Sequence, residues 1–182
     1  MRQTILRLFV LVFVAVTAQS CSNKLTPFTK RLQNQFQWEE SELQRIQFYL
    51  SDDIVLRRTL GIGESRISKG KIEVVDGREV EQVVFKEGTP GVMLFSPKDN
   101  RLAISFEEDS DKFLMFGPNP QVGGKYVLLA KDWNRRVGQV TYDGRTYTTN
   151  SESALSCLLV DLDKHKELDY SSKTVGGRKI DR

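Results

Sequence analysis

The chain has 182 residues, of which 39% are hydrophobic and 28% are charged, and its formal net charge is +3. This length suits one domain with a real core. The near balance of charge gives no case for nucleic-acid binding. Two cysteines and a single histidine, His165, exclude a disulfide framework and ordinary zinc sites of His and Cys.

The first twenty residues have the order of a secretory signal. Arg2 and Arg7 make the start basic, residues 8–16 (LFVLVFVAV) are apolar, and residues 17–20 (TAQS) are small and polar. The apolar run is too short for a membrane-spanning helix, which needs roughly 20 apolar residues. Removing the signal takes two of the 27 basic residues, so 25 basic and 24 acidic residues remain, a net charge of +1.

Cys21 follows Ser20 directly, and this junction resembles the lipobox of bacterial lipoproteins, in the looser form that occurs in Bacteroidota. Ser20 fits the box, whereas Ala18 and Gln19 depart from its usual Leu and small residue. The resemblance implies a diacylglycerol on the Cys21 sulfur, cleavage before Cys21 and acylation of the new amine, for example with palmitate. Two or more lipid chains make a stable anchor. The alternative is an ordinary cleaved signal that leaves Cys21 as a free thiol.

Residues 22–24 (SNK) indicate in which membrane, and on which face of it, the lipoprotein would lie. They lack the Asp that retains enterobacterial lipoproteins in the inner membrane. They also lack the acidic cluster that sends many Bacteroidota lipoproteins to the cell exterior. The resemblance therefore implies an outer-membrane lipoprotein that faces the periplasm.

Residues 21–27 are expected to form a lipidated tether, and Thr26 and Pro27 suit the start of a helix. Two short helices are predicted, at residues 28–36 and 39–48. Leu32 and Phe36 lie four residues apart, which gives the first helix one apolar stripe. Acidic residues at the start of the second helix suit its macrodipole.

From residue 47 the pattern favours short strands separated by turns. The strongest signals are two Asp-Gly pairs between β-branched runs, since a type I′ hairpin turn needs positive φ at both central residues. The predicted strands are residues 47–50, 54–60, 71–75, 78–86, 91–96, 101–107, 112–116, 125–131, 137–142, 145–149 and 155–162, with the Asp-Gly turns at 76–77 and 143–144. No long helix separates them, which argues against a parallel βαβ sheet.

The predicted fold is therefore mainly β: an antiparallel sandwich or barrel of about nine to ten short strands, preceded by one or two short N-terminal helices. Residues 28–168 are expected to form a single domain. Residues 169–182 are expected to be a flexible basic tail, either simply solvated or in contact with anionic lipid.

No catalytic residue, metal site or cofactor is predicted. A Ser-His-Asp or Cys-His site would have to use His165, which lies among lysines near the tail. Residues 107–111 (EEDSD) lack the glycine turn of an EF-hand and suit a solvated hairpin tip. Cys157 lies in an apolar run and is expected to be buried and inert, with an intermolecular disulfide as the alternative.

Two surfaces are candidates for binding a partner. The first is a glycine-bounded loop stiffened by prolines, and the second joins an aromatic residue to arginines, types that are frequent at interface hot spots. The candidate residues are Pro118, Asn119 and Pro120 in the loop, and Trp133, Arg135 and Arg136 in the second segment. The alternative for Trp133 is that it closes the core at a strand end while the arginines are solvated.

The sequence favours a non-enzymatic interaction or assembly module at the outer membrane, bound to an envelope protein partner and with its small-molecule ligand unknown. An alternative is a carbohydrate- or lipid-binding β domain, which predicts an apolar pocket or exposed aromatics. The candidate aromatics are Trp133, Tyr142 and Tyr147. A third reading is a hydrolase, which predicts two facing carboxylates in a cleft.

Overall fold

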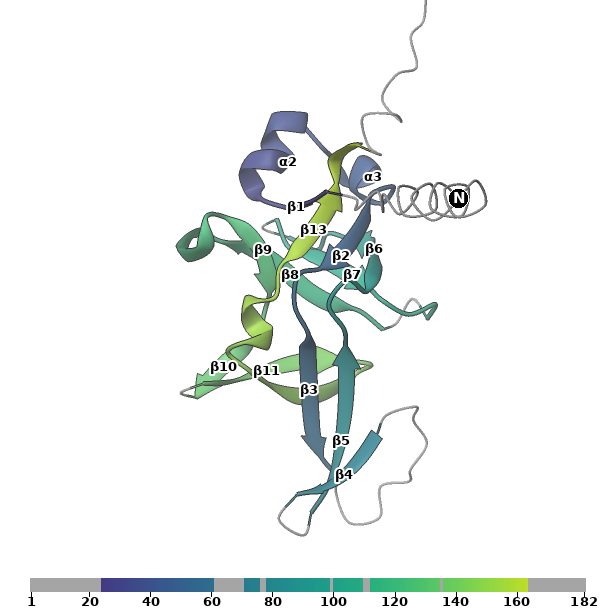
Figure 1. Cartoon of the computed structure of the whole chain (residues 1–182), viewed down its shortest axis with the longest axis vertical. Helices are drawn as coiled ribbons and strands as arrows, with labels where there is room; N and C mark the ends of the chain where they lie inside the picture. Colours follow the sequence, from purple (N-terminus) through teal and green to yellow (C-terminus); the bar gives the residue numbers. More distant parts are fainter. Residues whose placement is uncertain are drawn as a thin grey trace, which may run out of the picture.

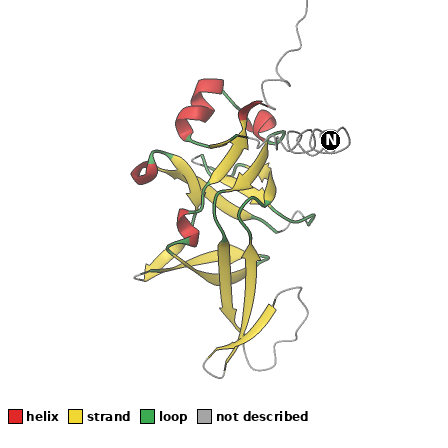
Figure 2. Cartoon of the chain, in the orientation of Figure 1, coloured by secondary structure: helices red, strands yellow, loops and turns green. Residues whose placement is uncertain are grey.

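The computed structural model describes residues 24–60, 71–75, 78–98, 100–109, 112–134 and 136–163. These residues form thirteen strands in two antiparallel sheets, with short helices near the N-terminus (Figure 1, Figure 2). The seven-stranded sheet has the order β1 (Leu25–Pro27), β13 (Leu158–Asp161), β2 (Gln47–Leu50), β6 (Pro90–Phe95), β7 (Leu102–Ser105), β8 (Leu114–Asn119) and β9 (Lys125–Leu128). The six-stranded sheet has the order β10 (Lys131–Asn134), β11 (Val137–Tyr142), β12 (Arg145–Asn150), β3 (Ile54–Thr59), β5 (Arg78–Phe85) and β4 (Lys71–Val75). The predicted mainly β, antiparallel fold is confirmed.

The Asp143-Gly144 pair joins two hairpin strands, as predicted. Tyr142 pairs with Arg145 across the turn, and Asp143 and Gly144 have φ angles of 50° and 66°. Positive φ at both positions is the type I′ geometry that matches the twist of the strands. Val75 of β4 pairs with Arg78 of β5, and the predicted turn at residues 76–77 between them lies outside the described residues.

Strands β1 and β10 were not expected, and with the eleven predicted segments they make thirteen strands, more than the nine or ten expected overall. Leu25, Thr26 and Pro27 pair with Asp161, Val160 and Leu159 of β13. The expectations that the tether runs to Pro27 and that a helix starts there are therefore wrong. β1 consists of residues that lack an alternating apolar pattern, and only the distant partner strand defines it.

The first helix, α2 (Lys30–Phe36), begins later than predicted, because Thr29 is its N-cap and accepts a hydrogen bond from the Leu32 amide. The second, α3 (Glu40–Leu43), is a single turn with a capping box between Glu39 and Glu42. The prediction that it continues to residue 48 is wrong. Residues 47–50 instead form β2, whose pairing with β6 and β13 outweighs the local helical pattern.

Four connections carry the chain between the sheets: β2 to β3, β5 to β6, β9 to β10, and β12 to β13 through the 3₁₀ turn η2 (Ser153–Leu155). Hydrogen bonds tie these crossings together. The Ser51 amide donates to the Cys157 carbonyl at 2.9 Å, and the Ser156 hydroxyl donates to the Asp52 carbonyl at 2.8 Å. Cys157 is buried there, 4% exposed and free, as its apolar surroundings predict.

The core runs without a break from one sheet to the other. Phe85 of β5 lies 5.5 Å from Phe106 and 5.3 Å from Tyr142 between ring centroids, and Phe106 contacts Phe116 of β8. Edge-to-face and tilted contacts of this kind are the preferred arrangements of aromatic rings. The aromatic chain therefore links the six-stranded sheet to the seven-stranded one.

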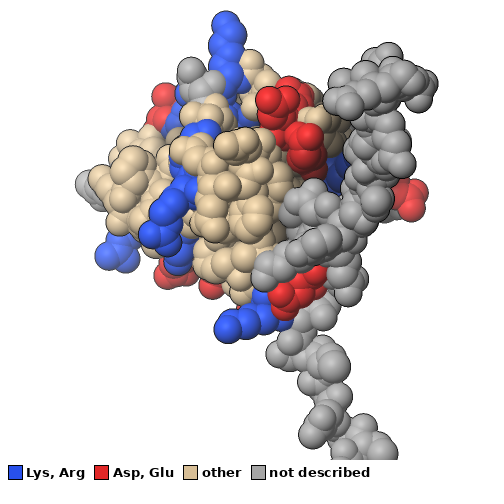
Figure 3. Space-filling view, turned by 90° about the horizontal axis from the view of Figure 1, so that it is seen from above, with Lys and Arg blue, Asp and Glu red and all other residues tan. Residues whose placement is uncertain are grey.

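No helix within the described ranges is long and apolar enough to span a membrane. Seen from above, the surface carries Lys and Arg as well as Asp and Glu around uncharged areas (Figure 3). That face therefore has no field of one sign, in keeping with the near balance of charge in the sequence.

Candidate ligand-binding groove

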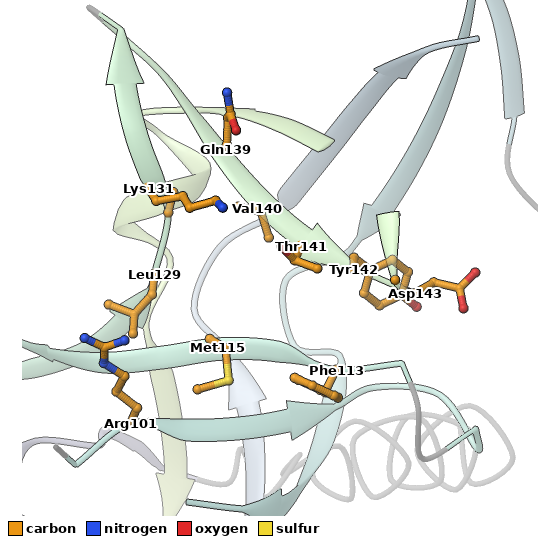
Figure 4. Close-up of a pocket in the computed structure, with 12 residues that line it drawn as sticks. Arg101, Phe113, Met115, Leu129, Lys131, Gln139, Val140, Thr141, Tyr142 and Asp143 are labelled. Atoms are coloured by element: carbon orange, nitrogen blue, oxygen red, sulfur yellow. The ribbon is translucent and has the colours of Figure 1, made fainter. Parts of the chain in front are cut away.

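A groove of about 640 Å³ lies where β8 and the end of β9 meet β11 of the other sheet. This volume falls in the range of small-molecule sites, about 300–1,000 Å³. Its lining is mostly apolar (Figure 4). The lining residues are Arg101, Phe113, Met115, Leu129, Ala130, Lys131, Gln139, Val140, Thr141, Tyr142, Asp143 and Gly144.

Two glycines let the walls of the groove approach each other. A Cβ on Gly117 would lie 3.0 Å from Leu129 Cδ1, and a Cβ on Gly138 would lie 2.8 Å from the Cβ of Ala130. Distances this short force neighbouring groups to move, so the missing side chains make room for the apolar lining. The Leu129 amide donates to the Met115 carbonyl at 2.8 Å and continues the contact with β8 beyond the end of β9.

One end of the groove is aromatic. Phe113 lies just before β8 and packs edge-to-face on Phe95, with 5.2 Å between ring centroids. Tyr142 ends β11, is 4% exposed, and donates a hydrogen bond to Glu107. Burial and the bond to Glu107 raise the pKa of Tyr142 well above its ordinary value of 10. The hydroxyl is therefore protonated at neutral pH and fixed by the loop that follows β7.

The other end of the groove carries two cations. Lys131 pairs with Gln139 at the start of β10, whereas Tyr142 lies three residues further along β11, about 10 Å away. Arg101 directly precedes Leu102, which pairs with Phe116. Figure 4 shows both cations on the side of Leu129, and Tyr142 on the opposite side with Asp143 beyond it.

The acidic loop after β7 is stabilised by ion pairs and a hydrogen bond between its own residues. Lys112 lies 2.9 Å from Asp109 and 3.2 Å from Glu107, and these two carboxylates raise the pKa of Lys112. The Ser105 hydroxyl donates to the Lys112 carbonyl at 2.8 Å. This loop is the predicted hairpin connection between β7 and β8, and its acids Glu107 and Asp109 contact Lys112, while Glu107 also accepts the hydrogen bond of Tyr142. No cluster of metal-ligating side chains occurs in the described part of the chain.

Among the described residues, the most deeply buried glutamate lies away from the groove, in the six-stranded sheet. Glu81 of β5 is 3% exposed and lies 2.9 Å from Arg58 Nη2 of β3. Tyr147 of β12 donates to the same carboxylate at 3.3 Å, and the Arg58 guanidinium lies over the Tyr147 ring at 5.9 Å from its centroid. This cluster joins three neighbouring strands and has the composition of a structural ion pair. Tyr147, a candidate ligand-stacking residue, is 2% exposed and belongs to this cluster.

Trp133 and Arg136 lie beside the groove and do not line it. Trp133 is on the edge strand β10, 45% exposed, so it does not close the core. Its ring packs over Gly138, where a Cβ would lie 3.0 Å from Trp133 Cε2. Arg136 is exposed, and Arg135 lies outside the described residues.

The candidate loop residues also lie away from the groove. Pro118 and Asn119 belong to β8, and Pro120 starts the 3₁₀ turn η1 (Pro120–Val122). The Asn119 side chain accepts a hydrogen bond from the Gln121 amide at 2.9 Å, and the Gly124 carbonyl accepts one from Lys30. These contacts give the loop a structural role in holding α2. Its predicted binding role stays a prediction.

The groove residues were not predicted as a site, although Tyr142 was named as a candidate aromatic. They come from four separate segments, and only the fold brings them together. One signal was present: residues 112–116 (KFLMF) are apolar on both faces. Leu114 and Phe116 are fully buried in the core, so Phe113 and Met115 must face something other than the core. Cys21 and His165 lie outside the described residues.

No family model, curated protein or solved structure matches this chain.

Proposed function

We propose that this chain is a lipid-anchored envelope protein without catalytic activity, whose β domain binds a ligand with an apolar part. One observation carries the proposal: the groove of about 640 Å³ between the two sheets, with apolar walls and charged ends. A pocket of this composition is what the carbohydrate- or lipid-binding alternative predicted. Apolar walls with a few polar groups are the usual make-up of small-molecule sites.

The anchor would keep the groove close to the membrane. Only residues 22–24 separate Cys21 from Leu25, where β1 begins. At 3.3–3.6 Å per residue, this segment reaches at most about 14 Å. Apolar ligands concentrate at membranes, so a domain held within this distance meets them where they are abundant. The expected location is the periplasmic face of the outer membrane.

Binding in the groove is tested with Nile red, a neutral apolar dye whose fluorescence rises in apolar surroundings. The mature chain, residues 21–182, carries Cys21→Ser, which removes the lipid attachment site and allows measurement without detergent. Met115→Glu is then added in the groove and is compared with Val92→Glu. Val92 is 44% exposed on β6 of the same sheet and does not line the groove.

We expect Nile red to bind the Cys21→Ser chain and the Val92→Glu variant alike, and the Met115→Glu variant at least about tenfold more weakly. A buried carboxylate is costly to desolvate, and a loss of 1.4 kcal/mol is already tenfold. Equal dye binding by the two glutamate variants, or no saturable binding by the parent chain, would overturn the proposed function. Thermal unfolding checks that both variants are folded.

A second candidate function, docking of an envelope protein, is favoured by the hairpin of β10 and β11. Trp133 and Val137 are each 45% exposed near its tip, and β10 is an edge strand. Asp132 has a φ of 51° and the β10–β11 register shifts there, which interrupts the edge against strand addition. Side chains would then provide the contact. Crosslinking in intact cells should lose a partner with Trp133→Ala and keep it with Leu155→Ala, a change at a residue 57% exposed elsewhere.

The anchor and its orientation are tested separately. Cys21→Ser should leave the β domain folded and release the protein from membranes washed with salt and carbonate. A variant that stays with the membrane would contradict the lipoprotein reading. Protease treatment of intact cells should spare the protein, whereas its rapid loss would show that it faces the cell exterior.

A further inference from the structure

The two ends of the groove carry opposite charges. Arg101 and Lys131 are exposed at one end. Among the described residues, no acidic group lies within 4 Å of either cation. Asp143 lies at the other end, beyond Tyr142, and Glu107 accepts the hydrogen bond of Tyr142 there. An anion is thus attracted to one end and repelled from the other.

The apolar lining lies between these charges. Met115 and Val140 lie between the cations, which stand beside Leu129, and the rings of Phe113 and Tyr142 (Figure 4). Register gives a separation of about 10 Å from Lys131 to Tyr142 along one wall, and of about 13 Å from Arg101 to Phe113 along the other. The groove therefore joins a cationic mouth to an apolar and aromatic channel.

We propose that the groove binds a single-chain amphiphile with a carboxylate head, the head at Arg101 and Lys131 and the chain running toward Phe113 and Tyr142. This inference rests on the proposed function, because it names the ligand class of the same groove. The guanidinium of Arg101 matches a carboxylate with two parallel N–H donors, and Lys131 adds a second positive charge. Asp143 sets the direction, because the reversed ligand would place two carboxylates together.

The size of the effect follows from the exposure of the two cations. Each exposed ion pair contributes about 0.2–1 kcal/mol and weakens with salt. Two such pairs at about 0.5 kcal/mol each correspond to about fivefold in affinity. The apolar lining supplies the rest of the binding, and this part is shared with a neutral ligand of the same chain length.

The experiment measures displacement of Nile red from the mature chain, residues 21–182 with Cys21→Ser, by lauric acid and by lauryl alcohol, each below its solubility limit. These ligands have the same chain and differ in the head group. The groove variant is Arg101→Gln with Lys131→Gln. The control is Lys98→Gln with Arg136→Gln, which removes the same charge from two nearby exposed cations that do not line the groove.

We expect lauric acid to bind about fivefold more tightly than the alcohol in the parent chain and in the control, and this preference to vanish in the groove variant. The preference should also shrink as salt is raised. Equal binding of acid and alcohol by the parent chain would overturn the carboxylate assignment while leaving the proposed function intact. Equal loss in the groove variant and the control would also overturn it, by assigning the preference to net charge. Absence of Nile red binding would instead refute the proposed function itself.

Discussion

Phe113 and Phe95 form a matched pair for separating ligand binding from stability. Their rings pack edge-to-face with centroids 5.2 Å apart, but only Phe113 lines the groove. Phe113→Ala and Phe95→Ala each remove the same ring contact. Only Phe113→Ala also removes part of the aromatic wall that a ligand would touch.

The expected sizes follow from these contacts. The aromatic pair contributes about 1 kcal/mol beyond area burial, so both variants should lose at least this much free energy of unfolding. If a ligand covers about a fifth of the roughly 200 Å² of a Phe ring, the lost contact is about 40 Å², or about 1 kcal/mol at 25 cal/mol per Å². Nile red and lauric acid should then bind Phe113→Ala about fivefold more weakly and Phe95→Ala with unchanged affinity.

Fluorescence titration gives the two affinities, and denaturant unfolding gives the two stabilities. Ligand affinity lowered equally by both variants would mean that the ring pair acts through overall stability. Affinity unchanged in Phe113→Ala would mean that the ligand does not use this wall. Either result would refute the placement of the ligand chain between the two sheets.

Three further predictions concern the scaffold. Gly91→Ala should destabilise the fold by about 1–3 kcal/mol in denaturant unfolding, because the new Cβ would lie 2.6 Å from the Phe106 ring; an unchanged midpoint would contradict this packing. Burial raises the pKa of Tyr126 from its ordinary 10 to about 12, so its contribution to stability is complete below about pH 10 and is lost as pH rises toward 12. The unfolding free energy of the parent chain should therefore fall more steeply between pH 10 and 12 than that of Tyr126→Phe, by up to about 1.4 kcal/mol per pH unit. Parallel plots of unfolding free energy against pH for the two proteins would exclude this effect. Glu81→Ala removes the carboxylate that Arg58 contacts at 2.9 Å and should cost about 2 kcal/mol in thermal or denaturant unfolding, whereas a loss within error would show that the pair contributes nothing net.

The parts of the fold that local chemistry determines were predictable from the sequence. The Asp143-Gly144 turn is the clearest case, because positive φ at both positions is nearly a requirement of two-residue hairpins. Residues 47–50 were also recognised as extended, although the same stretch was predicted to end a helix. The competition between these two readings was decided by pairing with β6 and β13, which no local pattern reveals.

The groove could not be predicted in the same way. Arg101, Phe113, Leu129 and Tyr142 are not neighbours in sequence, and their meeting depends on how the two sheets cross. Strand β10 was missed because all four of its residues are exposed, so it has no buried alternation to detect. A segment without a burial pattern carries little information about strand pairing. For this reason neither the edge strand β10 nor the cationic end of the groove could be predicted from the sequence.

The position of β13 has a consequence for the order of assembly. It lies between β1 and β2, so the last strand of the described residues is an interior strand of its sheet. The strand partner of Leu25 is Asp161, which follows it by more than a hundred residues in the sequence. During synthesis, β1 therefore stays without its neighbour until nearly the whole chain has emerged, and closing so long a loop is slow. A chain cut short before Leu158 would lose the pairing of two strands rather than one, which makes completion of the C-terminal strand a checkpoint for the whole sheet.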